Sequence, residues 1–167
     1  MGLNKITTHW TGGRNKPSAH ELECYHFLID SDGHIYKGKF APEDNINCND
    51  GKYAAHCGGG NTGNIGVAFC GCYVPKGISV KNTQFPLTRV QLEAGFQLCA
   101  KLCKTYDIPI NAEHVFTHYE FGITHPNTSS AGKIDITYMH PFPRETKATC
   151  GKFIRNKVLW YYKNINN

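Results

Sequence analysis

Residues 24–38 read Cys24-Tyr25-His26-Phe27-Leu28-Ile29-Asp30-Ser31-Asp32-Gly33-His34-Ile35-Tyr36-Lys37-Gly38. Two apolar runs flank Asp32-Gly33, and an Asp-Gly pair tolerates the positive φ angles that tight hairpin turns require. The segment therefore predicts two antiparallel strands joined by a short turn.

Strand and helix patterns alternate on both sides of this hairpin. Further strands are expected at residues 5–9, 64–70 and 114–118, and the turn-rich residues 41–63 are expected to form a surface loop. The alternation predicts an α/β fold in a single domain that spans residues 1–167.

Two helices are expected in the second half of the chain. Thr88-Arg89-Val90-Gln91 matches a capping box, and the helix that it begins should end near Tyr106, before Asp107-Ile108-Pro109. A terminal amphipathic helix is expected over about residues 145–163, and we predict that four of its residues face inward: Phe153, Ile154, Leu159 and Trp160.

Composition excludes several classes of protein. The chain has 167 residues, of which 40% are hydrophobic and 19% charged, which is typical of a globular domain. Its apolar runs are too short to cross a bilayer, so stable membrane insertion is not expected. The first twenty residues lack a secretory pattern, so we expect synthesis in the cytoplasm without a signal peptide.

The formal net charge of +5 favours polyanionic partners, which include nucleic acid, an anionic cell wall and a membrane surface. The lysines and arginines are scattered, with no run of five and no basic helix face, which weakens the nucleic-acid interpretation. A solvated basic surface is the simplest interpretation, and no nucleic-acid partner is expected.

Eight cysteines are present, and without a signal peptide they are expected to be reduced, buried thiols, although a disulfide for any pair stays open. The order of four possible ligands resembles that of a two-cysteine, two-histidine zinc finger, with Cys99-x3-Cys103 followed by His114-x3-His118. The ten-residue spacer is shorter than the usual ~12 and contains Asp107-Ile108-Pro109, which stops a helix where a finger would begin one. A zinc finger is therefore rejected.

Two histidines and one aspartate lie in polar motifs of three distant segments, Thr7-Thr8-His9-Trp10, Thr117-His118-Tyr119-Glu120 and Gly132-Lys133-Ile134-Asp135. Hydrolytic zinc sites use such ligands, and three of them leave the fourth tetrahedral position open for water. Zinc lowers the pKa of that water to about 7, so it attacks as hydroxide. We therefore expect Zn²⁺ at His9, His118 and Asp135, and treat His20 and His34 as surface or structural histidines.

Five segments in this order resemble the zinc-dependent N-acetylmuramoyl-L-alanine amidase family, which includes phage amidase-lysozymes and peptidoglycan-recognition proteins. The resemblance covers residues 6 to about 140, and its later motifs look most like phage or prophage lysins of Gram-negative hosts. The segments are Ile6-Thr7-Thr8-His9, Tyr25-His26-Phe27-Leu28-Ile29-Asp30-x-Asp32-Gly33, Ala55-His56-x4-Asn61-x3-Ile65-Gly66-Val67, Thr117-His118-x-Glu120 and Gly132-Lys133-x-Asp135.

The resemblance implies a central mixed β-sheet flanked by helices, with zinc in a surface groove. It also implies hydrolysis of the amide that joins N-acetylmuramic acid to L-alanine, with peptidoglycan or a soluble muropeptide as the substrate. We expect a monomer that acts like an endolysin and reaches the cell wall when lysis releases it. Cytosolic recycling of wall fragments fits the missing signal peptide equally well.

The resemblance also assigns roles to other residues. Tyr25 and Lys133 are expected to assist catalysis by donating to the oxyanion or orienting water. Lys133 lies two residues before Asp135, so an extended segment would point both side chains to one face. The alternatives are a core aromatic and an exposed lysine. His56 and Asn61 match a loop that contacts substrate, and loop-stabilising hydrogen bonds are the alternative.

One departure from the family concerns the general base. Some members carry a glutamate where this chain has Ala68. Either Tyr25 and Lys133 act together, or Glu120 substitutes, since residues 118 and 120 of a continuing strand face the same side. We favour the first arrangement. Glu120 is then expected to orient His118 through a contact with the side of the ring that faces away from the metal.

Two other functions stay open from the sequence alone. The same scaffold could be a non-catalytic module that binds or recognises peptidoglycan, although such members typically lose a metal ligand. A zinc-stabilised nucleic-acid binder would show a steeply salt-dependent affinity for DNA.

Overall fold

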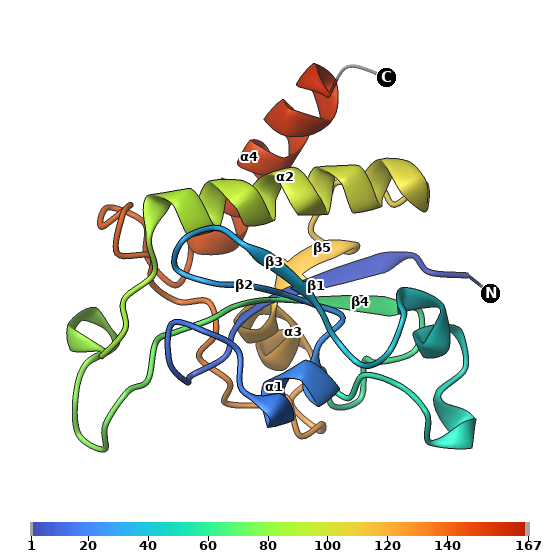
Figure 1. Cartoon of the computed structure of the whole chain (residues 1–167), viewed down its shortest axis with the longest axis horizontal. Helices are drawn as coiled ribbons and strands as arrows, with labels where there is room; N and C mark the ends of the chain where they lie inside the picture. The colour runs from blue at the N-terminus through green and yellow to red at the C-terminus, as the bar shows by residue number, and fades with distance from the viewer. Residues whose placement is uncertain (1, 166–167) are drawn as a thin grey trace.

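The computed structural model describes residues 2–165, which form one α/β domain around a mixed sheet (Figure 1). The sheet has five strands within the described residues, in the order β3-β2-β4-β1-β5. The strands are β1 (Lys5–Trp10), β2 (Phe27–Ile29), β3 (Ile35–Lys37), β4 (Asn64–Phe69) and β5 (Val115–Thr117). All neighbours pair in parallel except β2 and β3, which form the predicted antiparallel hairpin.

Helices cover both faces of this sheet (Figure 1). The long helices α2 (Arg89–Thr105) and α4 (Cys150–Asn164) lie on one face, and the short helices α1 (Ala19–Cys24) and α3 (His118–Thr124) lie on the other. Three 3₁₀ turns, η1 (Pro42–Ile46), η2 (Cys48–Asp50) and η3 (Val80–Asn82), lie in the connecting loops. The predicted sheet flanked by helices is confirmed.

The main core lies between the sheet and the two long helices. Phe69 of β4 meets Phe96 of α2 edge to face, with ring centroids 6.4 Å apart. All six residues of β4 are buried, as expected for a central parallel strand covered on both faces. None of the described helices is long and apolar enough to cross a membrane.

The cysteines contribute to this packing as thiols. All eight are free, and six of them are buried. Burial raises the pKa of Cys70, Cys72 and Cys103 to about 12, so these thiols stay protonated at neutral pH. The expectation of buried thiols fits these six cysteines, and Cys24 and Cys48 are only partly buried.

The prediction for the terminal helix needs two corrections. Helix α4 begins at Cys150, because residues 145–149 form turns around Thr146. The inward stripe of α4 repeats every four residues at Cys150, Ile154 and Val158. Leu159 and Trp160 were expected to be buried but lie on the outer side, 37% and 59% exposed.

Two other boundaries differ from the sequence prediction. Residue 24 belongs to α1 and not to the first strand of the hairpin, because a capping box formed by Ser18 and Glu21 starts a helix that runs to Cys24. The strand expected at 114–118 ends at Thr117, because Thr117 and Glu120 form a capping box that starts α3 at His118. The residue after this strand is therefore helical.

The buried Gln91 joins α2 to the ends of two strands. Its Nε2 donates to the carbonyl oxygens of Ile29 and Cys70, both at 2.8 Å, and its Oε1 accepts from the backbone N–H of Thr88. The predicted capping-box residue thus also satisfies two backbone carbonyls at the edge of the sheet that carries the site.

We predict that Gln91→Leu lowers the free energy of unfolding by about 2–4 kcal/mol, because two carbonyls lose a buried donor and the cap loses its reciprocal bond. Urea unfolding measures the change. Lys101→Leu, on the exposed side of the same helix, is the control and should shift stability by less than about 0.5 kcal/mol. Equal effects of the two substitutions would contradict the role assigned to Gln91.

Candidate metal centre

The parallel pairing of β1 and β5 brings two histidines together. Thr8 of β1 is the register partner of Thr117 of β5, so the next residues, His9 in β1 and His118 at the start of α3, lie side by side. Their ring centroids lie 4.6 Å apart. The two predicted histidine ligands, separated by more than a hundred residues of sequence, are therefore neighbours.

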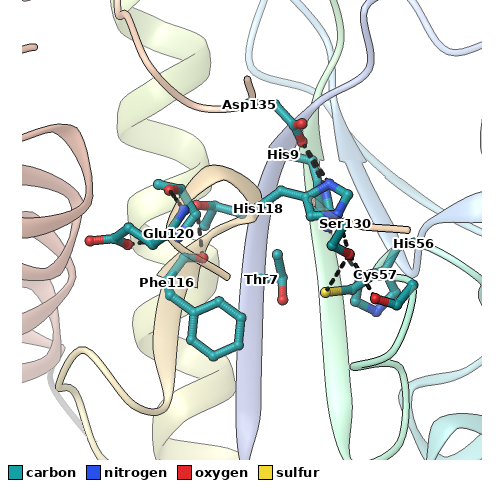
Figure 2. Close-up of polar contacts among 12 residues, drawn as sticks. Thr7, His9, His56, Cys57, Phe116, His118, Glu120, Ser130 and Asp135 are labelled. Atoms are coloured by element: carbon teal, nitrogen blue, oxygen red, sulfur yellow. Dashed lines mark hydrogen bonds and ion pairs between the residues drawn. The ribbon is translucent and has the colours of Figure 1, made fainter. Parts of the chain in front are cut away.

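Asp135 completes the group from the loop between α3 and α4. The backbone N–H of Tyr119 donates to the Asp135 carbonyl, at 2.6 Å, which fixes this loop against the first turn of α3. One carboxylate oxygen, Oδ2, lies 2.8 Å from Nδ1 of His9 and 3.3 Å from Nδ1 of His118 (Figure 2). All three side chains are buried, and their ligand atoms lie within 4.8 Å of one another.

The outer nitrogen of His9 faces a second histidine. Nε2 of His9 lies 3.1 Å from Nδ1 of His56, and Nε2 of His56 lies 3.2 Å from the carbonyl oxygen of Asn64. A carbonyl only accepts, so the network assigns the His56 proton to Nε2. Neutral His56 then accepts at Nδ1, and His9 must donate from Nε2.

The outer nitrogen of His118 is held in the same way by Ser130. Nε2 of His118 lies 2.9 Å from the Ser130 hydroxyl, which donates to the carbonyl of Gly58 at 2.8 Å (Figure 2). The serine has one hydroxyl proton, so it accepts from the Nε2–H of His118. Both imidazoles therefore carry their proton on the outer nitrogen and turn Nδ1 toward Asp135.

The protonation states agree with this assignment. Burial lowers the pKa of His9 to about 4, in spite of Asp135, and burial also lowers the pKa of His56 well below its usual value. Burial alone would raise the pKa of Asp135, but its contacts with the imidazoles of His118 and His9 hold that pKa below the ordinary value. At neutral pH the site holds neutral His9 and ionised Asp135.

This donor set fits a divalent cation. A nitrogen lone pair and an anionic oxygen repel each other at 2.8 Å, and a cation bound by both removes that repulsion. Metal ligands must be deprotonated at the binding atom, which the outer hydrogen bonds ensure here. Two imidazole nitrogens and one carboxylate oxygen suit zinc, and they leave one tetrahedral position open.

Tyr25 lies beside this centre, immediately after α1. Its ring centroid is 5.1 Å from that of His9. Burial, and after it the charge of Asp135, raise the pKa of the phenol, so Tyr25 stays a hydrogen-bond donor at neutral pH. Tyr25 therefore lies against His9, and its catalytic role stays a prediction.

Lys133 is exposed on the loop that carries Asp135. Its positive charge is one of the groups that lower the pKa of His9, so its field reaches the centre. Its backbone N–H donates to the Ser130 carbonyl at 3.2 Å, which ties Lys133 to the turn that holds His118. The expected role of Lys133 at the oxyanion also stays a prediction.

His56 and Asn61 were expected to contact substrate, and both have contacts within the protein. His56 is buried against His9, and Oδ1 of Asn61 accepts from the backbone N–H groups of His56 and Cys57. These contacts favour the alternative, in which the loop stabilises the site. A substrate contact of either residue, and the surface groove expected around the zinc, stay predictions.

The expectation for Glu120 was wrong. Because α3 begins at His118, Glu120 is the third residue of a helix rather than part of a strand, and it turns away from the ring (Figure 2). Its carboxylate forms a bidentate ion pair with Arg155 of α4, at 2.9 and 3.0 Å, and accepts from the backbone N–H of Thr117. Glu120 joins α3 to α4, and Ser130 holds His118 instead.

Ala68 occupies the position at which some family members were expected to carry a glutamate. It is the register partner of His9 in β4 and is fully buried, in a small cluster with Leu28 and Cys70 against which Tyr25 packs. At this position the chain therefore has no carboxylate, and Ala68 belongs instead to the apolar cluster on which Tyr25 packs.

The structure is an α/β domain in which two imidazoles and one carboxylate converge in an arrangement that suits a metal ion. Comparison with known proteins identifies its family. A family model described as N-acetylmuramoyl-L-alanine amidase matches residues 2–143. The chain belongs to this family, which is a class of enzymes. A search of curated proteins found no match.

Solved structures share the fold at low sequence identity. An endolysine N-acetylmuramoyl-L-alanine amidase, LysCS from Clostridium intestinale URNW, is 18% identical, with a TM-score of 0.57 over 95% of this chain and 85% of that one. The amidase AmiD from E. coli is 16% identical, with a TM-score of 0.59 over 93% of this chain and 57% of that one. Peptidoglycan recognition protein SD from Drosophila is 16% identical, with a TM-score of 0.50 over 76% and 74%.

We predict that Ser130→Ala weakens zinc binding by about 10- to 100-fold, because His118 loses the acceptor that fixes its tautomer and ring orientation. Competition with a chromophoric chelator measures the affinity. The control is Ser129→Ala, an exposed neighbour, which should bind zinc like the unmodified protein. Equal affinities of the two variants would show that Ser130 does not position the ligand.

Proposed function

We propose that this protein is a zinc-dependent hydrolase that cleaves the amide between N-acetylmuramic acid and L-alanine in peptidoglycan. The observation that carries the proposal is the convergence of His9 Nδ1, His118 Nδ1 and Asp135 Oδ2, in a network that assigns both imidazole protons to the outer nitrogens. Family membership supplies the amide bond as the target.

The three ligands would hold the electrophile of the reaction. A zinc ion bound by them would supply a Lewis acid for the amide carbonyl and for the attacking water. The residues behind the ligands, His56 and Ser130, keep both rings in one orientation. Because these hydrogen bonds are formed before substrate arrives, the site needs little reorganisation during turnover.

Tyr25 and Lys133 are the proposed donors to the charge that develops on the carbonyl oxygen. The phenol is held protonated, and the ammonium lies on the loop of Asp135, so each offers a proton to an oxyanion. With Ala68 in place of a glutamate, and Glu120 paired with Arg155, these two residues also remain the candidates for orienting the attacking water.

Similar structures support a peptidoglycan fragment as the substrate and lysis of the wall as the setting. The AmiD structure is described as a complex with anhydro-N-acetylmuramic acid-L-Ala-D-gamma-Glu-L-Lys, and the LysCS structure as an endolysine. We propose an endolysin-like enzyme that acts as a monomer on the cell wall or on soluble muropeptides.

A recognition module without catalysis is the second candidate. The similarity to peptidoglycan recognition protein SD favours it only through the fold. Release of peptide from the wall separates the two functions, because a recognition module binds sacculi and leaves the amide intact.

The metal requirement gives the first test of this function. We predict that a chelator, or the substitution Asp135→Asn, reduces release of stem peptide from purified sacculi by at least about 10³-fold, because the carbonyl loses its Lewis acid. Product mass spectrometry measures the release, and added zinc should restore activity only to the chelated enzyme. Asp32→Asn, at an exposed carboxylate of the hairpin, is the control. Full activity without bound metal would contradict the proposal.

The donors are tested separately from the metal. We predict that Tyr25→Phe and Lys133→Met each lower kcat by about 10²- to 10³-fold, the usual effect of losing one donor to an oxyanion. Zinc content and KM should change little, because neither residue is proposed as a ligand. Lys37→Met, at an exposed position of β3, serves as the control. A loss of zinc in either variant would assign it to metal binding instead.

A further inference from the structure

The net positive charge of this chain comes entirely from its C-terminal part. Residues 144–163 hold six cations, Arg144, Lys147, Lys152, Arg155, Lys157 and Lys163, against the single carboxylate of Glu145, a formal charge of +5. The whole chain also carries +5, so residues 1–143 are balanced, with twelve cations and twelve carboxylates. The family model ends at residue 143, immediately before this segment.

Two of these cations are neutralised within the fold and the others face solvent. Arg155 pairs with Glu120, and Lys157 pairs with Glu93 of α2. Lys152 and Lys163 are exposed, and within residues 2–165 neither forms an ion pair. At 100° per residue they lie within about 20° of each other around the helix, although a linear reading of the sequence shows only scattered lysines.

Apolar side chains lie between these lysines. The outer face of α4 consists of the exposed residues Lys152, Asn156, Leu159, Trp160, Lys163 and Asn164. Trp160 and Leu159 are the residues that were expected in the core, and they are 59% and 37% exposed. In Figure 1 the C-terminal end of α4, which carries them, extends past α2 on the side away from the sheet.

We propose that the outer face of α4 docks this enzyme on the surface of an anionic phospholipid bilayer. Each lysine near such a surface gains from the negative potential of the headgroups. An indole is favoured at the membrane interface, where its ring is apolar and its N–H remains hydrogen-bonded. The cations attract the surface, and Trp160 and Leu159 insert at the level of the headgroups.

The apolar pair distinguishes this partner from nucleic acid. Phosphates of a duplex are contacted by arginine, lysine and polar side chains, and a leucine at the centre of the face would gain nothing from them. The face lies across the sheet from the metal centre, since α4 and α3 cover opposite faces, so docking leaves the site free (Figure 1). The proposal is therefore independent of the catalytic function.

The fluorescence of Trp160 provides a direct test. The chain has two tryptophans, and Trp10 is buried in the core at 5% exposure, so a change in emission reports on Trp160. We expect vesicles of phosphatidylglycerol to shift the emission to shorter wavelength and to sediment the protein at low salt. Vesicles of phosphatidylcholine alone should do neither. A chelator should leave binding unchanged.

Charge reversal identifies the surface. In Lys152→Glu/Lys163→Glu we expect at least about 30-fold weaker binding to phosphatidylglycerol vesicles, since each lysine contributes about fivefold. The control Lys37→Glu/Lys52→Glu makes the same change in net charge at exposed positions of the catalytic part and should bind like the unmodified protein. Trp160→Ala should abolish insertion while leaving the fold intact, as thermal unfolding verifies.

Three results would overturn the proposal. The first is no binding of the unmodified protein to phosphatidylglycerol vesicles. The second is equal weakening in both double variants, which would show that net charge alone attracts the protein. The third is tight binding of a DNA oligonucleotide by the outer face of α4 without binding to vesicles.

Discussion

The parallel pairing of β1 with β5 is the constraint on which the metal centre depends. It sets Thr8 opposite Thr117 and so delivers His9 and His118 to the same edge of the sheet. The capping box of Thr117 then starts a helix at His118, which turns Glu120 toward α4 and leaves the back of the His118 ring to Ser130. The end of β5 at Thr117 therefore determines how the His118 ring is held in the site.

The loop between β3 and β4 is the second part of the site. Ser130, which holds His118, donates to the Gly58 carbonyl of this loop, and His56, which holds His9, is a residue of the same loop whose Nε2 meets the Asn64 carbonyl at the start of β4. The buried Asn45 anchors this loop by donating to the carbonyls of Ala54 and Asn61, while its Oδ1 faces the ring of His26. A long, glycine-rich connection thus acts as a rigid support, because it supplies His56 and the Gly58 carbonyl, through which the tautomer of each ligand is fixed.

The sequence predicted the sheet, the hairpin, the capped helix α2 and the grouping of His9 with His118 and Asp135, because these depend on local patterns and on motifs at strand ends. It did not predict Ser130, because its partners, His118 at the start of α3 and Gly58 on another loop, leave no periodic signal. Glu120 was misplaced because a strand and a helix turn the same residue in different directions. Trp160 was misplaced because the amphipathic pattern of α4 does not by itself determine which side meets α2.

The tautomers of the two imidazole ligands test this account most directly. Long-range ¹H–¹⁵N correlation spectra of the protein with zinc bound report the state of each ring nitrogen. The account predicts that His9 and His118 both carry a proton on Nε2 and bind zinc through Nδ1. Zinc bound through Nε2 of either ring, or spectra that do not respond to zinc at all, would contradict it.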